Sequence, residues 1–363
     1  MNKDPKISNI QMRALIVSTI IGVGILSLPN QLAGALDKDG WIAIIISTIS
    51  IMPVLMIINT IFKDNAGKDF FEIGKVALGK PIFIFCLIIY LMYYVAISAF
   101  VVRVLGDLIK GFLLTNTPIQ LIIVIFLLAV SYSAISEIDV IARVAYLTYP
   151  LVIGLAILLI LLALPGADYT NILPVFQSDI KNLPEALRVA VFSFSGFEIL
   201  LFCIPYAEQK EKVFKTSIKA ILVVGIIYLV LFFATLTQFS IDHIKADPYP
   251  LLMVAKLIDL PGYFLQNLDG LVMAIWVLVI FSTVLPLLYS SGKILGKLFD
   301  AKSHKYFVLI LIPVIYVVSA MPKNITELNP IIEIFMRYSG LLVTTIIPLA
   351  ILVVGRIRRR KKQ

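Results

Sequence analysis

The residues best placed to do chemistry lie inside an apolar stretch that also contains helix breakers. The stretch reads STIIGVGILSLPNQ and carries Gly22, Gly24 and Pro29 within about two helical turns. Glycine tolerates open backbone angles, and proline removes a donor and disfavours helix just before it. In hydrocarbon an unpaired backbone group is costly, so such a break survives only where it lines a polar cavity or a ligand. Half-helix ends suit an anion at their N–H groups and a cation at their C=O groups, and a free amino acid offers both charges.

A second apolar stretch repeats this pattern in the other half of the chain. It reads FSFSGFEILLFCIPY, and its GFEIL (196–200) matches GVGIL (22–26) at three of five positions, with a proline following in each. Breaks at corresponding positions of two inverted halves point to the binding site of secondary transporters. We therefore predict that both stretches are unwound binding segments. The alternative is that the glycines only let helices pack closely.

Polar side chains at membrane depth extend this candidate site. Glu198 aligns with Gly24, and it could bind a ligand amine, carry a proton or brace the unwound backbone. Tyr93 and Tyr94 lie on a long apolar run, with Ser98 one turn beyond Tyr94. The predicted ligand-binding residues are Gly22, Val23, Gly24, Ile25, Tyr93, Tyr94, Ser98, Ser195, Gly196, Phe197 and Glu198.

Two charged pairs have the spacing of ion pairs on one helix face. Arg103 and Asp107 lie four residues apart, as do Glu333 and Arg337. Both pairs lie toward the predicted outer ends of their helices. We interpret them as structural pairs or as parts of an outer gate rather than as substrate contacts.

The composition shows what kind of chain must position these residues. Of its 363 residues 60% are hydrophobic and 15% charged, against about 45–50% and about 25% in soluble domains, which predicts a membrane protein. The net charge of +9 comes from basic residues in short connections, where they set membrane orientation, so we exclude nucleic acid as a partner. The two cysteines and two histidines form no ligand cluster, and we find no nucleophile–base set. We therefore expect no metal, no cofactor and no enzymatic activity.

The predicted fold is an all-α integral membrane protein of about ten transmembrane helices in two inverted five-helix repeats, with helices 1 and 6 broken. The spans cover approximately 12–33, 41–62, 82–112, 118–135, 140–164, 186–206, 215–239, 264–288, 305–321 and 331–355. The segment DFFEIGKVALG is predicted to be a short interfacial helix. The lysine and arginine bias predicts that both termini are cytoplasmic.

These spans form one predicted permease-like domain over residues 1–363. Its first repeat covers about 12–164, its second about 186–355, and a basic cytoplasmic tail covers 356–363. We interpret the tail as a topology anchor, although a basic tail can also attract anionic lipid.

The sequence resembles a known family of membrane proteins. GVGILSLP resembles the first-helix signature of amino acid–polyamine–organocation permeases. The span number, the short tails and FSFSGFEILLFCIPY are more specifically similar to the spore germination permeases, the B-type subunits of spore germinant receptors. The resemblance implies an inner-membrane location in the spore, an A-type membrane subunit and a C-type lipoprotein as partners, and a small nutrient ligand. It also implies that the third span flanks the site.

The resemblance raises the possibility of an ion site at Ser282 and Thr283. In related transporters an adjacent hydroxyl pair on this helix helps to hold sodium with carbonyls of the first helix. The two hydroxyls could equally cap their own backbone.

We therefore predict a membrane subunit of a nutrient germinant receptor that binds a small ligand, an amino acid, and triggers spore germination. The alternative is a proton- or sodium-coupled amino acid transporter. Fold alone does not separate the two.

Overall fold

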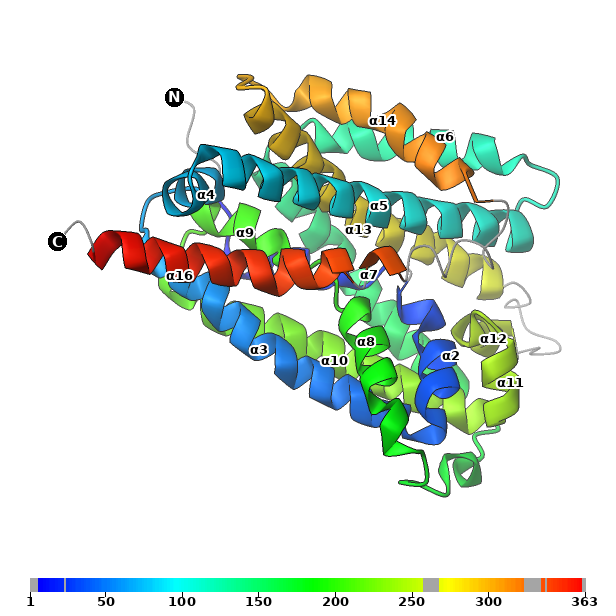
Figure 1. Ribbon diagram of the computed structural model, residues 1–363. Helices are drawn as coiled ribbons and strands as arrows, with labels where there is room; N and C mark the ends of the chain where they lie inside the picture. Colours follow the sequence, from blue (N-terminus) through cyan, green and yellow to red (C-terminus); the bar gives the residue numbers. More distant parts are fainter. Residues whose placement is uncertain (1–5, 23, 257–267, 323–333, 337, 361–363) are drawn as a thin grey trace.

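The structure is a bundle of long α-helices that lie side by side (Figure 1). It is a computed structural model that describes residues 6–22, 24–256, 268–322, 334–336 and 338–360. Within these residues the only pairing of extended backbone is an isolated bridge between Ile7 and Ala207. The predicted all-α class is therefore confirmed.

The first half of the chain begins with a helix that is broken in two. Its helices are α1 (Asn9–Ile20), α2 (Gly24–Leu36), α3 (Gly40–Asp64), α4 (Phe70–Leu78), α5 (Lys80–Phe112), α6 (Ile119–Ala134) and α7 (Ile138–Ala163), with the 3₁₀ turn η1 (Asp37–Asp39) between α2 and α3.

The second half also begins with a broken helix. It consists of α8 (Leu183–Ser193) and the run η4 (Phe197–Ile199), α9 (Leu200–Cys203) and η5 (Ile204–Tyr206). Then follow α10 (Val213–Gln238), α11 (Ile241–Ala246), α12 (Pro250–Lys256), α13 (Leu268–Leu298), α14 (Lys305–Ala320), the π-helical η7 (Leu342–Ile346) and α16 (Ile347–Arg360). The 3₁₀ turns η2 (Tyr169–Ile172), η3 (Ile180–Asn182) and η6 (Lys210–Lys212) lie in the connections.

Helix lengths recur in the same order in the two halves. After each broken helix comes a long helix, 25 residues in α3 and 26 in α10. After one or two short helices comes the longest of each half, 33 residues in α5 and 31 in α13, and then a helix of 16 residues, α6 or α14. This recurrence agrees with the predicted pair of five-helix repeats, whose exact bounds stay a prediction.

Length and composition identify most, but not all, of the predicted spans. Six helical stretches of the described residues are long and apolar enough to cross a membrane, or seven if the pair bent by 45° at the second break is one span. The helices α6 and α14 are apolar but shorter than the roughly 20 residues that a span needs. The predicted number of ten therefore stays a prediction, and parts of 264–288 and 331–355 lie outside the described residues.

Local sequence signals explain where α1 and α4 begin. Ser8 and Gln11 form a capping box at α1, and Asp69 and Glu72 form another at α4. Helix α4 then ends at Gly79, whose φ of +87° favours glycine. The predicted short helix before the third span is thus confirmed, and its position at the membrane interface stays a prediction.

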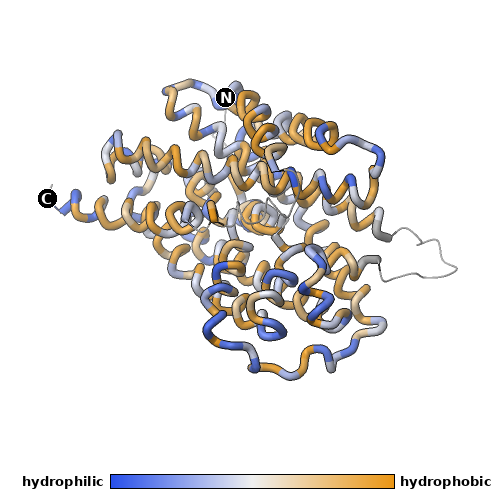
Figure 2. The backbone as a smooth tube through the Cα atoms, turned by 45° about the vertical axis from the view of Figure 1, so that its right-hand side comes forward, coloured by the Kyte–Doolittle hydropathy of each residue, from blue (hydrophilic) through white to orange (hydrophobic). Residues whose placement is uncertain are grey.

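Both chain ends lie at the same end of the bundle, whereas α11 and α12 lie at the other (Figure 1). Hydrophobic residues follow the long helices, and hydrophilic ones gather in connections and at the C-terminal end (Figure 2). This arrangement agrees with a multi-pass membrane protein. That the shared end is cytoplasmic stays a prediction from the basic residues.

Candidate functional site

The first predicted break lies where the sequence places it. Helix α1 ends at Ile20, the Gly22 N–H donates to the Ile20 carbonyl at 2.9 Å, and α2 restarts at Gly24. The predicted ligand contact Val23 lies outside the described residues. The interruption leaves the carbonyl end of α1 and the N–H end of α2 facing the same gap.

The second break is built differently. Helix α8 ends at Ser193, and Gly196 takes a left-handed φ of +112° before the chain continues as the 3₁₀ turn η4. The Tyr228 hydroxyl of α10 donates to the Ser193 carbonyl at 2.6 Å, which satisfies one of the carbonyls that α8 leaves unpaired. The predicted breaks in helices 1 and 6 are both confirmed.

The two breaks touch each other. A Cβ atom added to Gly196 would lie 3.0 Å from both the Cγ2 and the carbonyl oxygen of Thr19, at the end of α1. A Cβ atom added to Gly24 would lie 3.7 Å from the Cα of Ser193, at the end of α8. The helix ends from both halves of the chain therefore meet at one place.

Glu198 is the charged residue at this junction. Its side chain is fully buried, and its Oε2 accepts a hydrogen bond of 2.9 Å from the N–H of Gly196. Its other oxygen, Oε1, has no hydrogen-bond partner among the described residues. One oxygen thus braces the unwound backbone, which is one of the roles predicted for Glu198. The other oxygen remains able to accept a hydrogen bond from a ligand.

Helix α5 contributes three buried hydroxyls, one of which lies near this carboxylate. The Tyr93 hydroxyl lies beside the side chains of Ser195 and Glu198. The hydroxyls of Tyr93, Tyr94 and Ser98 are buried without a hydrogen-bond partner in the part of the chain that the structure describes. Buried polar atoms are normally paired, so unpaired ones indicate a place where water or a ligand belongs.

The neighbouring Tyr90 provides a contrast. Its hydroxyl donates to the Val343 carbonyl at 2.7 Å, inside the π-helical turn η7. A π-bulge leaves a carbonyl without its usual helical partner, and Tyr90 supplies one. We therefore assign Tyr90 to structure rather than to ligand contact.

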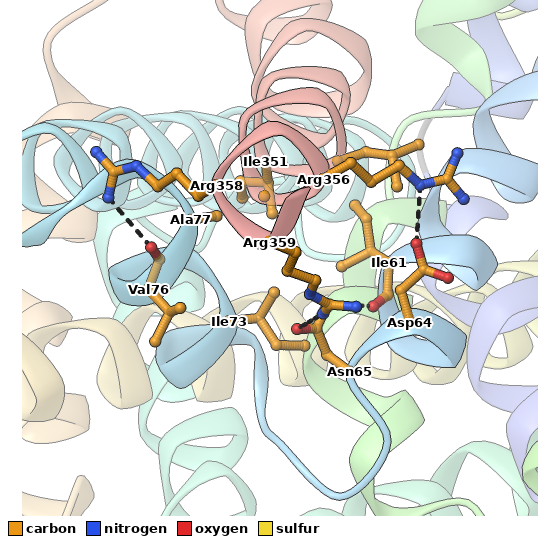
Figure 3. A pocket seen from close by; sticks show the side chains of 12 residues that line it. Ile61, Asp64, Asn65, Ile73, Val76, Ala77, Ile351, Arg356, Arg358 and Arg359 are labelled. Atoms are coloured by element: carbon orange, nitrogen blue, oxygen red, sulfur yellow. Dashed lines mark hydrogen bonds and ion pairs between the residues drawn. The ribbon is translucent and has the colours of Figure 1, made fainter. Parts of the chain in front are cut away.

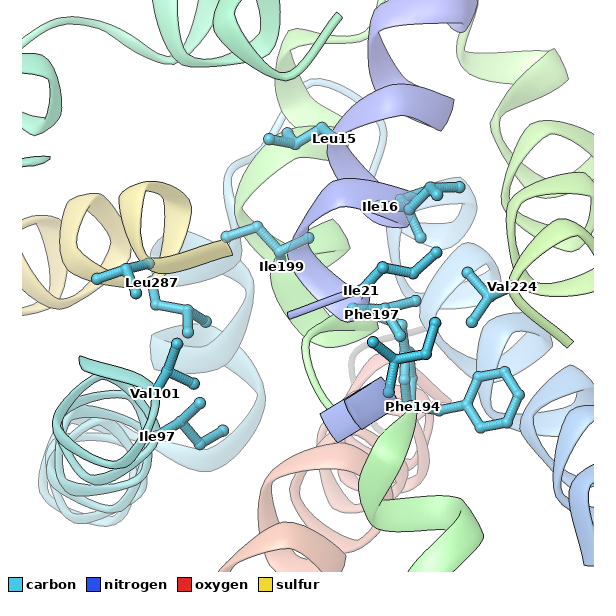
Figure 4. Close-up of a cluster of buried hydrophobic side chains, with 14 of the residues drawn as sticks. Leu15, Ile16, Ile21, Ile97, Val101, Phe194, Phe197, Ile199, Val224 and Leu287 are labelled. Atoms are coloured by element: carbon cyan, nitrogen blue, oxygen red, sulfur yellow. The ribbon is translucent and has the colours of Figure 1, made fainter. Parts of the chain in front are cut away.

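Apolar side chains enclose the junction. Figure 4 shows Ile21, Phe194 and Phe197 clustered at the two breaks, with Val224 of α10 beside them. Ile25 is buried and lines a small apolar cavity, while Ser195 is half-buried. This apolar shell excludes water and so strengthens any charge interaction inside it.

The hydroxyl pair on α13 divides its roles. Ser282 donates to the Val279 carbonyl of its own helix at 2.8 Å, which is the capping alternative. The Thr283 Oγ1 lies 2.7 Å from the Ser18 carbonyl oxygen and 3.3 Å from that of Ile21, so it bridges α13 to the carbonyl end of α1. A site for a cation at these oxygens stays a prediction.

Several contributors were missed from the sequence. Thr19 packs directly against Gly196. Trp276 of α13 lines the same small cavity as Ile25, and its indole N–H has no hydrogen-bond partner within the described residues. Thr19 could have been proposed from the sequence, because Ser18 and Thr19 are hydroxyl residues directly before the first break. No sequence signal pointed to Trp276, because its position depends on how α13 packs across α1.

The predicted ion pair on α5 is confirmed. Arg103 Nε lies 3.0 Å from Asp107 Oδ2, and Arg103 Nη1 also donates to the Ser319 carbonyl of α14. The pair therefore ties α5 to α14. The second predicted pair, Glu333 with Arg337, lies outside the described residues.

Contacts at both ends of the bundle tie the first broken helix to other parts of the chain. At the end that carries the termini, the Ile7 N–H donates to the Tyr206 carbonyl at 2.8 Å, and the Glu208 N–H donates to the Ile7 carbonyl at 3.0 Å. At the other end, Asn30 of α2 donates to the Ile244 carbonyl of α11 at 2.9 Å.

Comparison with known proteins identifies the family. A family model described as "Spore germination protein" matches residues 6–328. The chain belongs to the spore germination protein family. It is 24% identical over 356 residues to spore germination protein YndE of Bacillus subtilis, covering 98% of each chain. It is 25% identical over 360 residues to spore germination protein GerLB of Bacillus cereus, covering 98% of this chain and 96% of that one.

Solved structures share the fold. MhsT in complex with L-phenylalanine matches with a TM-score of 0.71 at 16% identity, over 97% of this chain and 99% of that chain. Mhp1, a nucleobase-cation-symport-1 family transporter, matches with a TM-score of 0.68 at 14% identity, over 93% and 78%. The predicted family and permease fold are thereby confirmed, and these names describe germination proteins and transporters rather than enzymes.

Proposed function

We propose that this germination protein is the ligand-binding membrane subunit of a nutrient germinant receptor, and that it binds a free amino acid between its two broken helices. The observation that carries the proposal is the contact between the breaks, with the unpaired oxygen of buried Glu198 beside them.

The charges at the junction suit a zwitterion in one orientation. The N–H end of α2 begins at Gly24 and attracts an anion such as a carboxylate. At the other break the Gly196 N–H is already occupied by the carboxylate of Glu198. The ligand carboxylate therefore belongs at α2 and its ammonium group at Glu198, with the hydroxyls of Tyr93 and Tyr94 as further partners.

Signalling requires that the ligand favour one packing of the broken helices over another. Since α1 and α2 contact the second break directly, a ligand held between them changes how both helices pack on the bundle. We propose that an A-type subunit and a C-type lipoprotein respond to this change, in the inner membrane of the spore, with both termini of this chain cytoplasmic.

Deleting the gene tests the receptor role. Spores should lose their response to one class of nutrient, while vegetative growth on that nutrient continues. Normal germination together with lost growth would contradict the proposal and identify an uptake transporter instead.

The alternative function, a proton- or sodium-coupled amino acid transporter, draws on the fold and on the meeting of Thr283 with two carbonyls of the first span. Uptake of radiolabelled amino acids into vesicles that contain the purified chain separates the two. The receptor proposal predicts binding without accumulation. Accumulation that depends on a sodium or proton gradient would favour the transporter.

A further inference from the structure

A cavity of about 320 Å³ lies at the end of the bundle that carries the termini, apart from the junction of the breaks. Its apolar wall includes Ile61 of α3, Ile73 of α4 and Ile351 of α16. Its rim carries Arg356, Arg358 and Arg359 of α16 (Figure 3). An apolar interior under a basic rim suits a molecule that is anionic at one end and apolar at the other.

The rim has more positive charge than the protein itself neutralises. Arg356 pairs with Asp64 at 2.9 Å, and Asp64 is the one acidic residue among those lining the cavity. Arg358 donates to the Val76 carbonyl at 3.2 Å, and Arg359 donates to the Asn65 side chain. Three guanidinium groups against one carboxylate leave an excess of two positive charges at the rim. Their planar donor groups match a phosphate with paired hydrogen bonds.

The surface around the cavity is apolar where a lipid tail would lie. Val76, which lines the cavity, is 59% exposed, and the lining residues beside it, Ala77, Ile351 and Leu352, are apolar. Helix α16 passes from such apolar residues into the arginines, which is the order of hydrocarbon and headgroup at a membrane surface. A small soluble anion has no apolar part that could pack against the isoleucine wall.

We propose that this cavity binds an anionic glycerophospholipid, with its phosphate at the arginine rim and its acyl chain against the apolar wall that includes Ile61, Ile73 and Ile351. Such a bound lipid would link α16 to α4. Helix α4 in turn contacts the second broken helix, because the Phe70 ring lies 5.4 Å from that of Phe202. The site is thus placed to stabilise the part of that helix that contains Phe202.

Thermal unfolding of the purified full chain in detergent tests the site. Added phosphatidylglycerol should raise the apparent Tm by on the order of 3 °C more than phosphatidylcholine does, and millimolar inorganic phosphate should not. The double variant Arg358→Gln/Arg359→Gln should lose this difference and retain less phospholipid through purification. Lys210→Gln/Lys212→Gln, which removes two exposed charges away from the cavity, should keep both.

Three results would overturn the proposal. Equal responses of the two double variants to phosphatidylglycerol would show general surface charge. A full response to inorganic phosphate would show a site for a soluble anion. Loss of a protein partner from the arginine variant, with no lipid effect in any variant, would show a protein interface. If the double variant does not accumulate, Arg358→Gln alone provides the same comparison, because within the described residues the Arg358 side chain makes a single hydrogen bond, to the Val76 carbonyl.

Discussion

The two breaks occupy equivalent positions in the two halves, yet the protein completes them in opposite ways. At the first break, the Thr283 hydroxyl of another helix bonds to the carbonyl end of α1, and the N–H end of α2 begins at Gly24. At the second break, Glu198 bonds to the backbone N–H of Gly196 from within the break itself. Gly24 and Glu198 occupy the same position in the two repeats. At this position the first repeat has a glycine at a helix N-terminus, which attracts an anion, and the second repeat has a carboxylate, which attracts a cation.

If the junction binds an amino acid, as we propose, this difference would let a symmetric scaffold hold an asymmetric ligand in one orientation. Two identical breaks would offer the same charge to both ends of a zwitterion. A bare helix end facing a buried carboxylate would offer opposite charges to the two ends of the ligand. The following predictions test this comparison, from the largest expected effect to the smallest.

Gly196→Ala should cause the largest loss. Its φ of +112° disfavours any side chain, and the added Cβ would lie 3.0 Å from the Thr19 backbone oxygen, which cannot move as a side chain can. We expect loss of the germination response and a fall in stability on the order of 1–3 kcal/mol, measured by thermal unfolding. Gly24→Ala is the matched control for stability, because its Cβ would meet only ordinary contacts from 3.7 Å. Equal losses of stability from both variants would contradict the described difference between the breaks.

Thr283→Val should have the next largest effect. It keeps the side-chain shape but removes the donor to the Ser18 carbonyl, and leaving a buried carbonyl unpaired costs about 1–3 kcal/mol. Ser282→Ala should cost less, since that hydroxyl bonds only within its own helix. Thr283→Ser should restore most of the lost stability. Indifference to Thr283→Val would mean that the first break is held by other contacts.

Tyr93→Phe and Tyr90→Phe should separate ligand contact from structure. Tyr93→Phe removes an unpaired hydroxyl, so stability should stay within about 0.5 kcal/mol while ligand affinity falls. Tyr90→Phe removes the bond to Val343 and should lower stability by about 1 kcal/mol with affinity unchanged. If Tyr93→Phe lowered stability and Tyr90→Phe lowered ligand affinity, the assignment of Tyr93 to the ligand site would be wrong.

The sequence was most informative where the determining signal is local. Glycine and proline inside apolar runs located both breaks, and the segment DFFEIGKVALG was correctly predicted to contain a short helix. The count of ten spans was made from apolar runs, and it stays a prediction because α6 and α14 are too short to be identified as spans by length alone.

Contacts between distant segments were beyond the sequence. Nothing near Gly196 shows that Thr19 lies against it, and nothing near Glu198 shows that its two oxygens have different surroundings. The arginines of the tail were recognised as basic, but the cavity beneath them forms only where α16 packs against α3 and α4, which lie far from it in the chain. Such features depend on tertiary packing, which residue patterns within one segment do not encode.

The most direct test of the central claim is a double-mutant cycle between Glu198 and the amino group of the ligand. A panel of free proteinogenic amino acids is screened for stabilisation of the purified chain, and the amino acid that binds is then compared with its des-amino analogue on the wild type and on Glu198→Gln. Each change alone should weaken binding at least about tenfold, about 1.4 kcal/mol, because it breaks a buried ion pair. Both changes together should weaken binding little more than either alone, since they remove the same interaction. Additive losses, or full affinity of Glu198→Gln for the amino acid, would contradict the account.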